Sequence, residues 1–409
     1  MNSVWKTFLA ICAGAQTIED PDYSAEEWRE LFEMAARQEL LPMVLEACLS
    51  CASQKNLERG ERKKWRDAAV SIAVRQIVQT NELLTLILHA QDRGLDPIVV
   101  KGIVCRVLYP KPYLRFSVDE DFFIRPEESG AWHDFLLSEG YDLSRHGEDA
   151  DRLAEPSFHK EGSALCIELH KYLFPPDSEA FKELNRYFSD AYDHTVTVSV
   201  EDVTFKTLLP TDHFLFLILH AYKHFLYSGF GIRQVMDMSV FIERYGQEIN
   251  WKYIRKCCDE VHADVFAAAV LKIAKKYLGL PAIPEEFGRL AEGVDEEPLL
   301  ADMISGGLYG VSNMARAHSS NITLKAAEDQ KTGRRSLLPK TLFPGIGYLK
   351  LHFPYARKYP LLLPAAWLHR IVKYLAKDRD GRSGNPLETL KIGRERVELL
   401  KKYGIIDGQ

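Results

Sequence analysis

The stretch Phe116-Ser-Val-Asp-Glu-Asp-Phe-Phe-Ile124 decides the fold of this chain. Two aspartates, Asp119 and Asp121, precede three consecutive apolar residues, which is typical of a buried strand that begins at the carboxylates. Side chains alternate between the faces of a strand, so we expect the two aspartates to share one face and Glu120 to lie on the other. Burying two like charges is costly unless a cation neutralises them. Mg²⁺ binds one or two carboxylates and keeps water and phosphate as its other ligands, so the pattern predicts a metal site that handles a nucleotide.

A short strand and a glycine lie just upstream of this pair. The run Pro97-Ile-Val-Val100 is β-branched, Lys101 and Gly102 follow it, and residues 103–109 have a helical apolar pattern that stops at Pro110. A helix that starts directly after a strand exposes backbone N–H groups at its N-terminus. We therefore expect an anion site there, to which Lys101 adds a positive charge.

A third acid follows downstream on another strand-like run. Residues 164–170 carry Glu168, residues 157–159 would be the hairpin partner, and a helix is expected over residues 127–140. His170 lies two residues after Glu168 and therefore on the same strand face. Its imidazole either orients that carboxylate or simply packs at the end of the strand.

The order of strand, glycine-led helix, strand, helix and hairpin resembles the minimal nucleotidyltransferase core of the DNA polymerase β superfamily. More narrowly, the chain is similar to the uncharacterised bacterial nucleotidyltransferase family, whose pattern runs Lys-Gly, Tyr-Pro, Arg, Asp-x-Asp and Glu-Leu-His. The corresponding residues here are Lys101-Gly102, Tyr109-Pro110, Arg115, Asp119-Glu-Asp121 and Glu168-Leu-His170. The resemblance continues through a helical segment that contains His220, His224, Arg233 and Asp237, and it covers nearly the whole chain.

This resemblance implies an α+β fold with a small mixed β-sheet core between N-terminal and C-terminal helical regions. It implies transfer of a nucleoside monophosphate from a triphosphate to a hydroxyl or phosphate acceptor, with release of pyrophosphate. Asp119, Asp121 and Glu168 would hold two Mg²⁺ (or Mn²⁺) ions, and Glu168 would also act as general base. The residues expected to contact the nucleotide are Lys101, Gly102, Arg115, Ser117, His220, His224 and Arg233.

Two departures from the superfamily pattern support an alternative. Gly102 is followed by Ile103 where a serine or glycine is usual, and Lys101 and Ser117 are the candidates to replace the missing contact. The middle residue of Asp-x-Asp is Glu120, for which we expect Arg115 or Arg125 as the partner. The alternative is a non-catalytic nucleotide-binding or interaction protein on the same fold.

The helical segment also allows simpler interpretations. His220 and His224 are four residues apart, a spacing that chelates zinc, but no third ligand is evident, so core histidines are the competing account. Arg233 and Asp237 are also four apart, which favours an ion pair within one helix unless Arg233 faces the nucleotide.

Length and periodicity predict several structural units in the 409 residues, of which 46% are hydrophobic. The expected units are an N-terminal helical region (1–94), the nucleotidyltransferase core (95–208), a helical domain (209–318), a mobile linker (319–340) and a basic amphipathic helical tail (341–409). Between residues 348 and 402 there are 13 Lys/Arg and 5 Asp/Glu, an excess of +8. The tail either contacts a membrane surface or a protein partner, or packs on the body with its basic face in solvent.

Charge and cysteine content restrict the class of protein further. The net charge of −6 argues against a protein that coats nucleic acids, and the acceptor stays open among a small molecule, a sugar, a protein and an RNA. Seven scattered cysteines are typical of reduced thiols in the cytoplasm. We expect no signal peptide and no transmembrane segment.

Overall fold

The computed structural model describes residues 2–144, 153, 155–227, 229–308, 322–324, 326–327 and 386–406. These residues form a mixed seven-stranded sheet and a set of helices, which confirms the predicted α+β class. The strands are β1 Ile98–Val100, β2 Glu120–Phe123, β3 Asp142–Leu143, β4 Ser157–His159, β5 Cys166–His170, β6 Thr195–Val200 and β7 Val203–Leu208.

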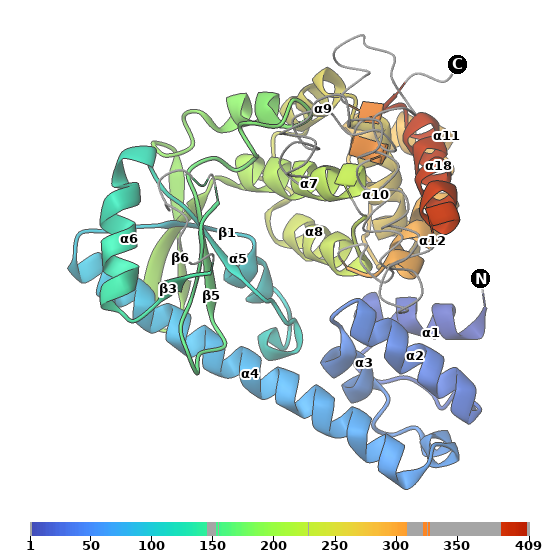
Figure 1. Cartoon of the computed structure of the whole chain (residues 1–409). Helices are drawn as coiled ribbons and strands as arrows, with labels where there is room; N and C mark the ends of the chain where they lie inside the picture. The colour runs from blue at the N-terminus through green and yellow to red at the C-terminus, as the bar shows by residue number, and fades with distance from the viewer. Residues whose placement is uncertain are drawn as a thin grey trace, which may run out of the picture.

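The helices surround this sheet and extend well beyond it (Figure 1). Those that precede or interrupt the sheet in sequence are α1 Ser3–Cys12, α2 Ala25–Arg37, α3 Leu41–Ala47, α4 Arg59–Asp92, α5 Gly102–Arg106 and α6 Ser129–Ser138. Those that follow it are α7 Pro210–Tyr227, α8 Ile232–Tyr245, α9 Trp251–Glu260, α10 Asp264–Tyr277, α11 Glu285–Gly293, α12 Glu297–Gly306 and α18 Pro386–Lys402. Short 3₁₀ turns cover Ala52–Asn56, Pro112–Leu114, Pro126–Glu128 and Lys182–Phe188.

The strand order across the sheet is β3-β4-β5-β2-β1-β7-β6. The strand β2 lies at the centre, antiparallel to β1 and parallel to β5, and β7 runs parallel to β1. The predicted hairpin of residues 157–159 with the strand that carries Glu168 is present as the antiparallel pair β4 and β5. The sequence order of strand, short helix, strand, helix and hairpin is therefore confirmed.

Each face of the sheet has its own hydrophobic cluster. One face packs against the C-terminal half of α4 and against α6, with Phe122 of β2 in contact with Trp132 of α6. The opposite face carries Phe123 and belongs to a larger cluster that runs through α1–α3, α7–α12 and the end of α18. Because β2 alternates between these faces, Glu120 lies on the side of Phe122, and Asp121 lies on the side of the helices α7 and α8.

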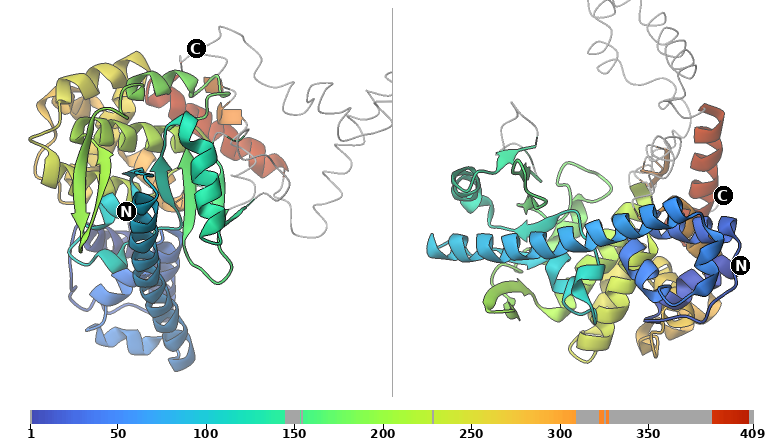
Figure 2. Two further views of the ribbon diagram at one scale, coloured as in Figure 1. Left: turned by 90° about the vertical axis from the view of Figure 1, so that its left-hand side faces the viewer. Right: turned by 90° about the horizontal axis from the view of Figure 1, so that it is seen from below.

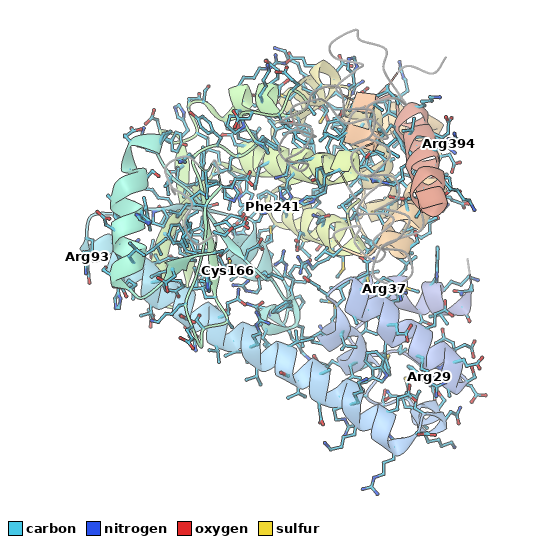
Figure 3. The ribbon with its side chains drawn as sticks, viewed as in Figure 1. Arg29, Arg37, Arg93, Cys166, Phe241 and Arg394 are labelled. Atoms are coloured by element: carbon cyan, nitrogen blue, oxygen red, sulfur yellow. The ribbon has the colours of Figure 1, made fainter. Side chains whose placement is uncertain are left out.

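The helix α4 connects the N-terminal helices to the sheet. Figures 1 and 2 show it as one long helix that starts beside α2 and α3 and ends behind the strands. The preceding helix α2 begins at a capping box in which Ser24 and Glu27 exchange hydrogen bonds, as the sequence predicts. Figure 3 places Cys166 of β5 on the sheet and Phe241 of α8 in the interior, with Arg29, Arg93 and Arg394 at the outer edges of the molecule.

The predicted linker over residues 319–340 lies outside the described residues except for short helical pieces at 322–324 and 326–327. The predicted tail over residues 341–409 is described only from 386 to 406. Most of the residues that would form its basic face therefore lie outside the described residues. The division into units at residues 94, 208 and 318 stays a prediction. In the part of the chain that the structure describes, no helix combines the length and the apolar character that a membrane crossing requires.

Candidate active site

The two strands that were predicted to carry the acidic residues are neighbours in the middle of the sheet. Strands β2 and β5 are parallel neighbours, and their register places Asp121 directly beside Glu168. Asp119 immediately precedes β2. All three carboxylates line a cavity of about 230 Å³ between the sheet and the helices α7 and α8, called the acidic cavity below. Every residue that the sequence analysis selected lines it: Lys101, Gly102, Arg115, Ser117, Asp119, Asp121, Glu168, His220, His224 and Arg233.

The Asp121 carboxylate contacts two basic side chains of this cavity. Its side chain is almost fully buried, Lys101 Nζ lies 2.9 Å from Oδ2, and His170 Nε2 lies 2.7 Å from Oδ1. The same imidazole nitrogen lies 3.5 Å from Glu168 Oε2. His170 therefore contacts both carboxylates, a geometry that favours the first of its two interpretations, in which it orients Glu168.

Burial and neighbouring charges separate the pKa values of these groups. Burial, together with the Asp121 carboxylate, raises the pKa of Asp119 to about 6. Burial would also raise the pKa of Asp121, but Lys101 and the hydrogen bond with His170 outweigh it and lower that pKa below its ordinary value. Burial opposes ionisation of His170, yet its hydrogen bonds to Asp121 and Glu168 raise its pKa to about 9. The strand acids are thus ionised and partly neutralised by internal cations at neutral pH.

The donor set fits a divalent cation. Among the described residues, one group of three potential ligands has its atoms within 4.8 Å of one another: Asp121, Glu168 and His170. Asp121 and Glu168 would supply the carboxylate oxygens that suit Mg²⁺ and Mn²⁺, whereas His170, whose pKa is about 9, is protonated at neutral pH and donates hydrogen bonds to them. Asp119 lines the same cavity but stands outside this closest group.

Lys101 is held by a chain of buried hydrogen bonds behind the cavity. Its backbone is in an uncommon conformation with φ +53° and ψ −118°, and its N–H donates to His213 Nε2 at 3.1 Å. His213 Nδ1 then lies 3.1 Å from Thr207 Oγ1, which donates to the carbonyl of Val99 at 2.7 Å. This sequence of donors requires a neutral imidazole with its proton on Nδ1, and burial lowers the pKa of His213 to about 3.

Glu120, the middle residue of Asp-x-Asp, forms a separate buried network on the other side of β2. Its Oε1 accepts from Arg106 at 2.7 Å and from Ser117 at 3.1 Å, and its Oε2 accepts from the backbone N–H of Ile103 at 2.9 Å. A Cβ atom on Gly102, whose φ is +21°, would collide with Glu120 Oε2. The glycine is therefore required by the close approach of this carboxylate.

This network corrects two predictions. The expected partners of Glu120 were wrong, because the turn of α5 brings Arg106 to the strand, whereas Arg125 pairs with Asp193 and Arg115 pairs elsewhere. The expectation of free N–H groups at the start of α5 was also wrong for Ile103, whose amide is bonded to Glu120.

The helices α7 and α8 form the opposite wall of the acidic cavity. Asp237 of α8 binds Arg115 at 2.5 and 3.1 Å and accepts from the Tyr109 hydroxyl at 2.8 Å. Arg233 instead contacts Glu39 and the carbonyl of Phe116. The alternative of an ion pair between Arg233 and Asp237 within α8 was therefore wrong.

His220 and His224 of α7 do not form a chelate with a third protein ligand in the described chain. Their Nε2 atoms lie 3.2 Å apart, and Lys101 Nζ lies 3.2 Å from His220 Nε2. An ammonium group only donates, so His220 Nε2 accepts. Burial and the nearby lysines lower the pKa of both imidazoles, that of His224 to about 3.

Two charged residues of the cavity were not identified by the sequence analysis. Lys223 of α7 is half-buried, and its closest carboxylate among the described residues is Glu155, at 3.9 Å. Burial lowers the pKa of Lys223, which the approach of an anion would reverse. The position of Lys223, three residues after His220 and next to His224, was the available signal. Glu155 stands before the hairpin in a stretch without any pattern.

A mixed sheet that presents paired acids to a cavity with several cations has a chemistry suited to a divalent cation and a polyanion. A family model described as "Uncharacterised nucleotidyltransferase" matches residues 24–279, more than half of the chain, and the chain belongs to this nucleotidyltransferase family. The match begins at the cap of α2 and ends just after α10, so it includes the sheet and both helices of the cavity wall. Neither a curated protein nor a solved structure matches the chain.

Proposed function

We propose that this chain transfers a nucleoside monophosphate from a nucleoside triphosphate to a hydroxyl or phosphate acceptor, with AMP as the default group. The observation that carries the proposal is the register that sets Asp121 beside Glu168 in a cavity that also holds Lys101 and Lys223. Asp119, Asp121 and Glu168 would hold Mg²⁺ or Mn²⁺. When bound, such an ion neutralises phosphate charge and lowers the pKa of an acceptor hydroxyl.

The side chains of the cavity have separate roles in this reaction. The acceptor oxygen bonds to the α-phosphorus as the bond to pyrophosphate breaks, and Glu168 takes the acceptor proton. Lys223, which approaches no carboxylate closely, balances the charge of the departing pyrophosphate, and Lys101 contributes once a cation at Asp121 releases its ammonium group. Arg115 and Arg233 are already paired with Asp237 and Glu39, so they would shape the cavity around the nucleotide rather than supply free charge.

A second candidate is a nucleotide-binding protein without turnover. One observation favours it: Glu120 occupies the amide of Ile103 at the start of α5, where the sequence predicts a phosphate contact. Binding of a triphosphate that depends on Mg²⁺, without any transfer, would support this candidate.

The test is incubation of the purified protein with each of the four α-labelled triphosphates, Mg²⁺ and a cell extract. We expect label to move to an acceptor with the wild-type protein and not with the Asp119→Ala/Asp121→Ala variant. An Asp193→Asn variant is the control, because that aspartate is exposed and pairs with Arg125 outside the cavity. Equal labelling by the wild type and the double variant would refute the proposal.

A further inference from the structure

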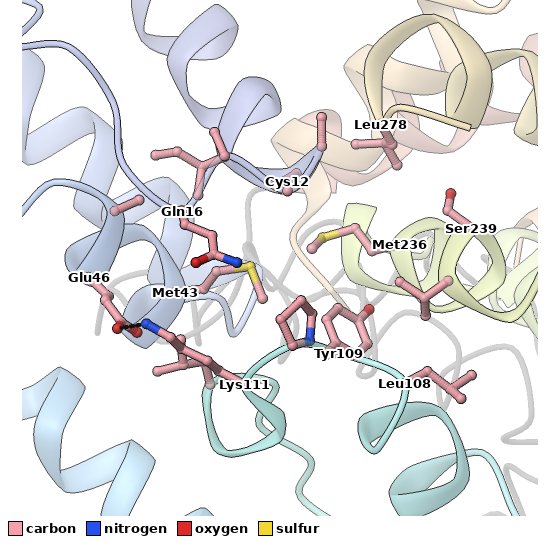
Figure 4. A pocket seen from close by; sticks show the side chains of 18 of the residues that line it. Cys12, Gln16, Met43, Glu46, Leu108, Tyr109, Lys111, Met236, Ser239 and Leu278 are labelled. Atoms are coloured by element: carbon pink, nitrogen blue, oxygen red, sulfur yellow. Dashed lines mark hydrogen bonds and ion pairs between the residues drawn. The ribbon is translucent and has the colours of Figure 1, made fainter. Parts of the chain in front are cut away.

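A second cavity, of about 240 Å³, lies between the N-terminal helices and α8 (Figure 4). The end of α1 and the helix α3 form one side, and α8 with the segment after α5 forms the other. It is larger than the cavities of roughly 150 Å³ that bind benzene in proteins. We call it the apolar cavity. Tyr109 lines it while its hydroxyl bonds Asp237, which lines the acidic cavity, so this tyrosine and aspartate stand between the two.

Most of the lining is aliphatic or sulfur-containing. Met43 of α3 and Met236 of α8 approach the cavity from opposite sides in Figure 4. Methionine side chains are flexible and polarizable, so they adapt to ligands of varied shape. The other apolar side chains of the lining include Ile11, Cys12, Leu108, Leu114, Val240 and Leu278. Such a lining accepts the apolar body of a ligand.

The charged groups that line the cavity are Glu46, Glu243 and Lys111, beside the polar side chains of Gln16 and Ser239. Glu46 forms an ion pair with Lys111 through Oε1, but its Oε2 is buried and has no hydrogen-bond partner among the described residues. Glu243 at the rim has no ion pair in the described part of the chain. Two carboxylates therefore face one ammonium group. A buried carboxylate oxygen without a donor is costly, and a ligand that brings an N–H group would satisfy it.

We propose that the apolar cavity binds a small amine with a compact apolar body, with its ammonium group at Glu46 Oε2. The carbon chain would lie between Met43 and Met236. Anionic molecules of the same size are disfavoured because Glu46 and Glu243 outnumber Lys111. The site is independent of the proposed nucleotidyl transfer and needs no nucleotide for its test.

The experiment compares hexylamine, 1-hexanol and hexanoate by calorimetric titration of the full chain. These probes share a six-carbon body and differ in the head group. We expect hexylamine to bind most tightly and hexanoate least. The Glu46→Gln variant should weaken hexylamine binding about tenfold and leave 1-hexanol unchanged. The Glu33→Gln variant is the control, because this exposed glutamate of α2 does not line the cavity.

Methyl spectra of ¹³C-methionine-labelled protein locate the site without relying on a charge variant. The chain has seven methionines, and hexylamine should shift the signals of Met43 and Met236 selectively. The volume-conserving variants Met43→Leu and Met236→Leu assign these signals. Equal affinity of the three probes, absence of hexylamine binding, or shifts confined to other methionines would each overturn the proposal.

Discussion

Lys223 of the acidic cavity lies farther from its nearest carboxylate than Lys101 and Arg115 lie from theirs. Lys101 lies 2.9 Å from Asp121 and Arg115 lies 2.5 Å from Asp237, whereas Lys223 lies 3.9 Å from Glu155. A lysine that approaches no carboxylate closely remains available to an incoming phosphate group.

Replacement of Lys223 by methionine should therefore raise the KM for the triphosphate by roughly 10- to 100-fold, the equivalent of a hydrogen bond to a charged group. The Lys275→Met variant is the matched control, because this lysine is exposed on α10 and outside the cavity. Steady-state kinetics with varied triphosphate measure both. An unchanged KM in the Lys223 variant would show that the phosphates lie elsewhere.

Gly102 and Glu120 depend on each other. A methyl group at residue 102 meets the Glu120 carboxylate and also requires an unusual φ, so Gly102→Ala should destabilise the protein by about 2 kcal/mol or more. Gly130→Ala in α6 meets no atom within 4 Å and should be neutral or slightly stabilising. Urea unfolding of both variants decides the matter, and equal stability of the two would contradict this account.

At the scale of elements, the connection between β1 and α5 depends on a neutral histidine. The pKa of His213 is about 3 in the folded protein, against an ordinary value of 6.5. The unfolded chain therefore binds more protons between these values. The contribution of His213 to stability is complete above pH 6.5 and is lost as the pH falls toward 3.

Lowering the pH from 7 to 5 should therefore cost the wild-type protein about 2 kcal/mol through His213 alone. The His213→Gln variant should lose less stability over this interval, although it is less stable at pH 7. His194→Gln, at an exposed position, should retain the wild-type slope. Urea unfolding at both pH values provides the comparison, and identical slopes for wild type and His213→Gln would contradict a His213 that is neutral in the folded protein.

The elements themselves were predictable, but many of their partners were not. Short apolar runs identified β2 and β5, and the spacing of the acids together with the resemblance identified the candidate site, because these signals lie within short windows of sequence. The pairs Arg115–Asp237 and Arg233–Glu39 join residues 122 and 194 positions apart. Local spacing suggested an Arg233–Asp237 pair instead. Lys223 and Glu155 were missed because these residues, 68 positions apart, come together only in the folded chain.

At the scale of the whole molecule, the C-terminal helix α18 reinforces the cavity wall from outside the matched region. Arg396 is buried and donates to the carbonyls of Phe225 and Tyr227 at the end of α7, the helix that carries His220 and Lys223. Carbonyl groups at a helix C-terminus lack partners within the helix. A cation there also interacts favourably with the helix dipole.

Arg396→Leu should thus lower stability by about 2 kcal/mol or more, because the buried carbonyl of Phe225 loses its charged donor. Arg394→Leu, on the exposed side of the same helix, should change stability by less than about 0.5 kcal/mol. Thermal unfolding of the two variants tests the contact. A similar Tm for both would mean that α18 does not support α7 through Arg396.

The most direct test of the central claim compares ATP labelled at the α-phosphorus with ATP labelled at the γ-phosphorus, in the presence of Mg²⁺ and the acceptor-containing extract. We predict that the α-label becomes attached to an acceptor and the γ-label leaves as pyrophosphate. Both outcomes should disappear with EDTA and in the Asp121→Asn variant, and persist in Asp193→Asn. Transfer of the γ-label to the acceptor, or transfer of the α-label by Asp121→Asn at the wild-type rate, would contradict the account.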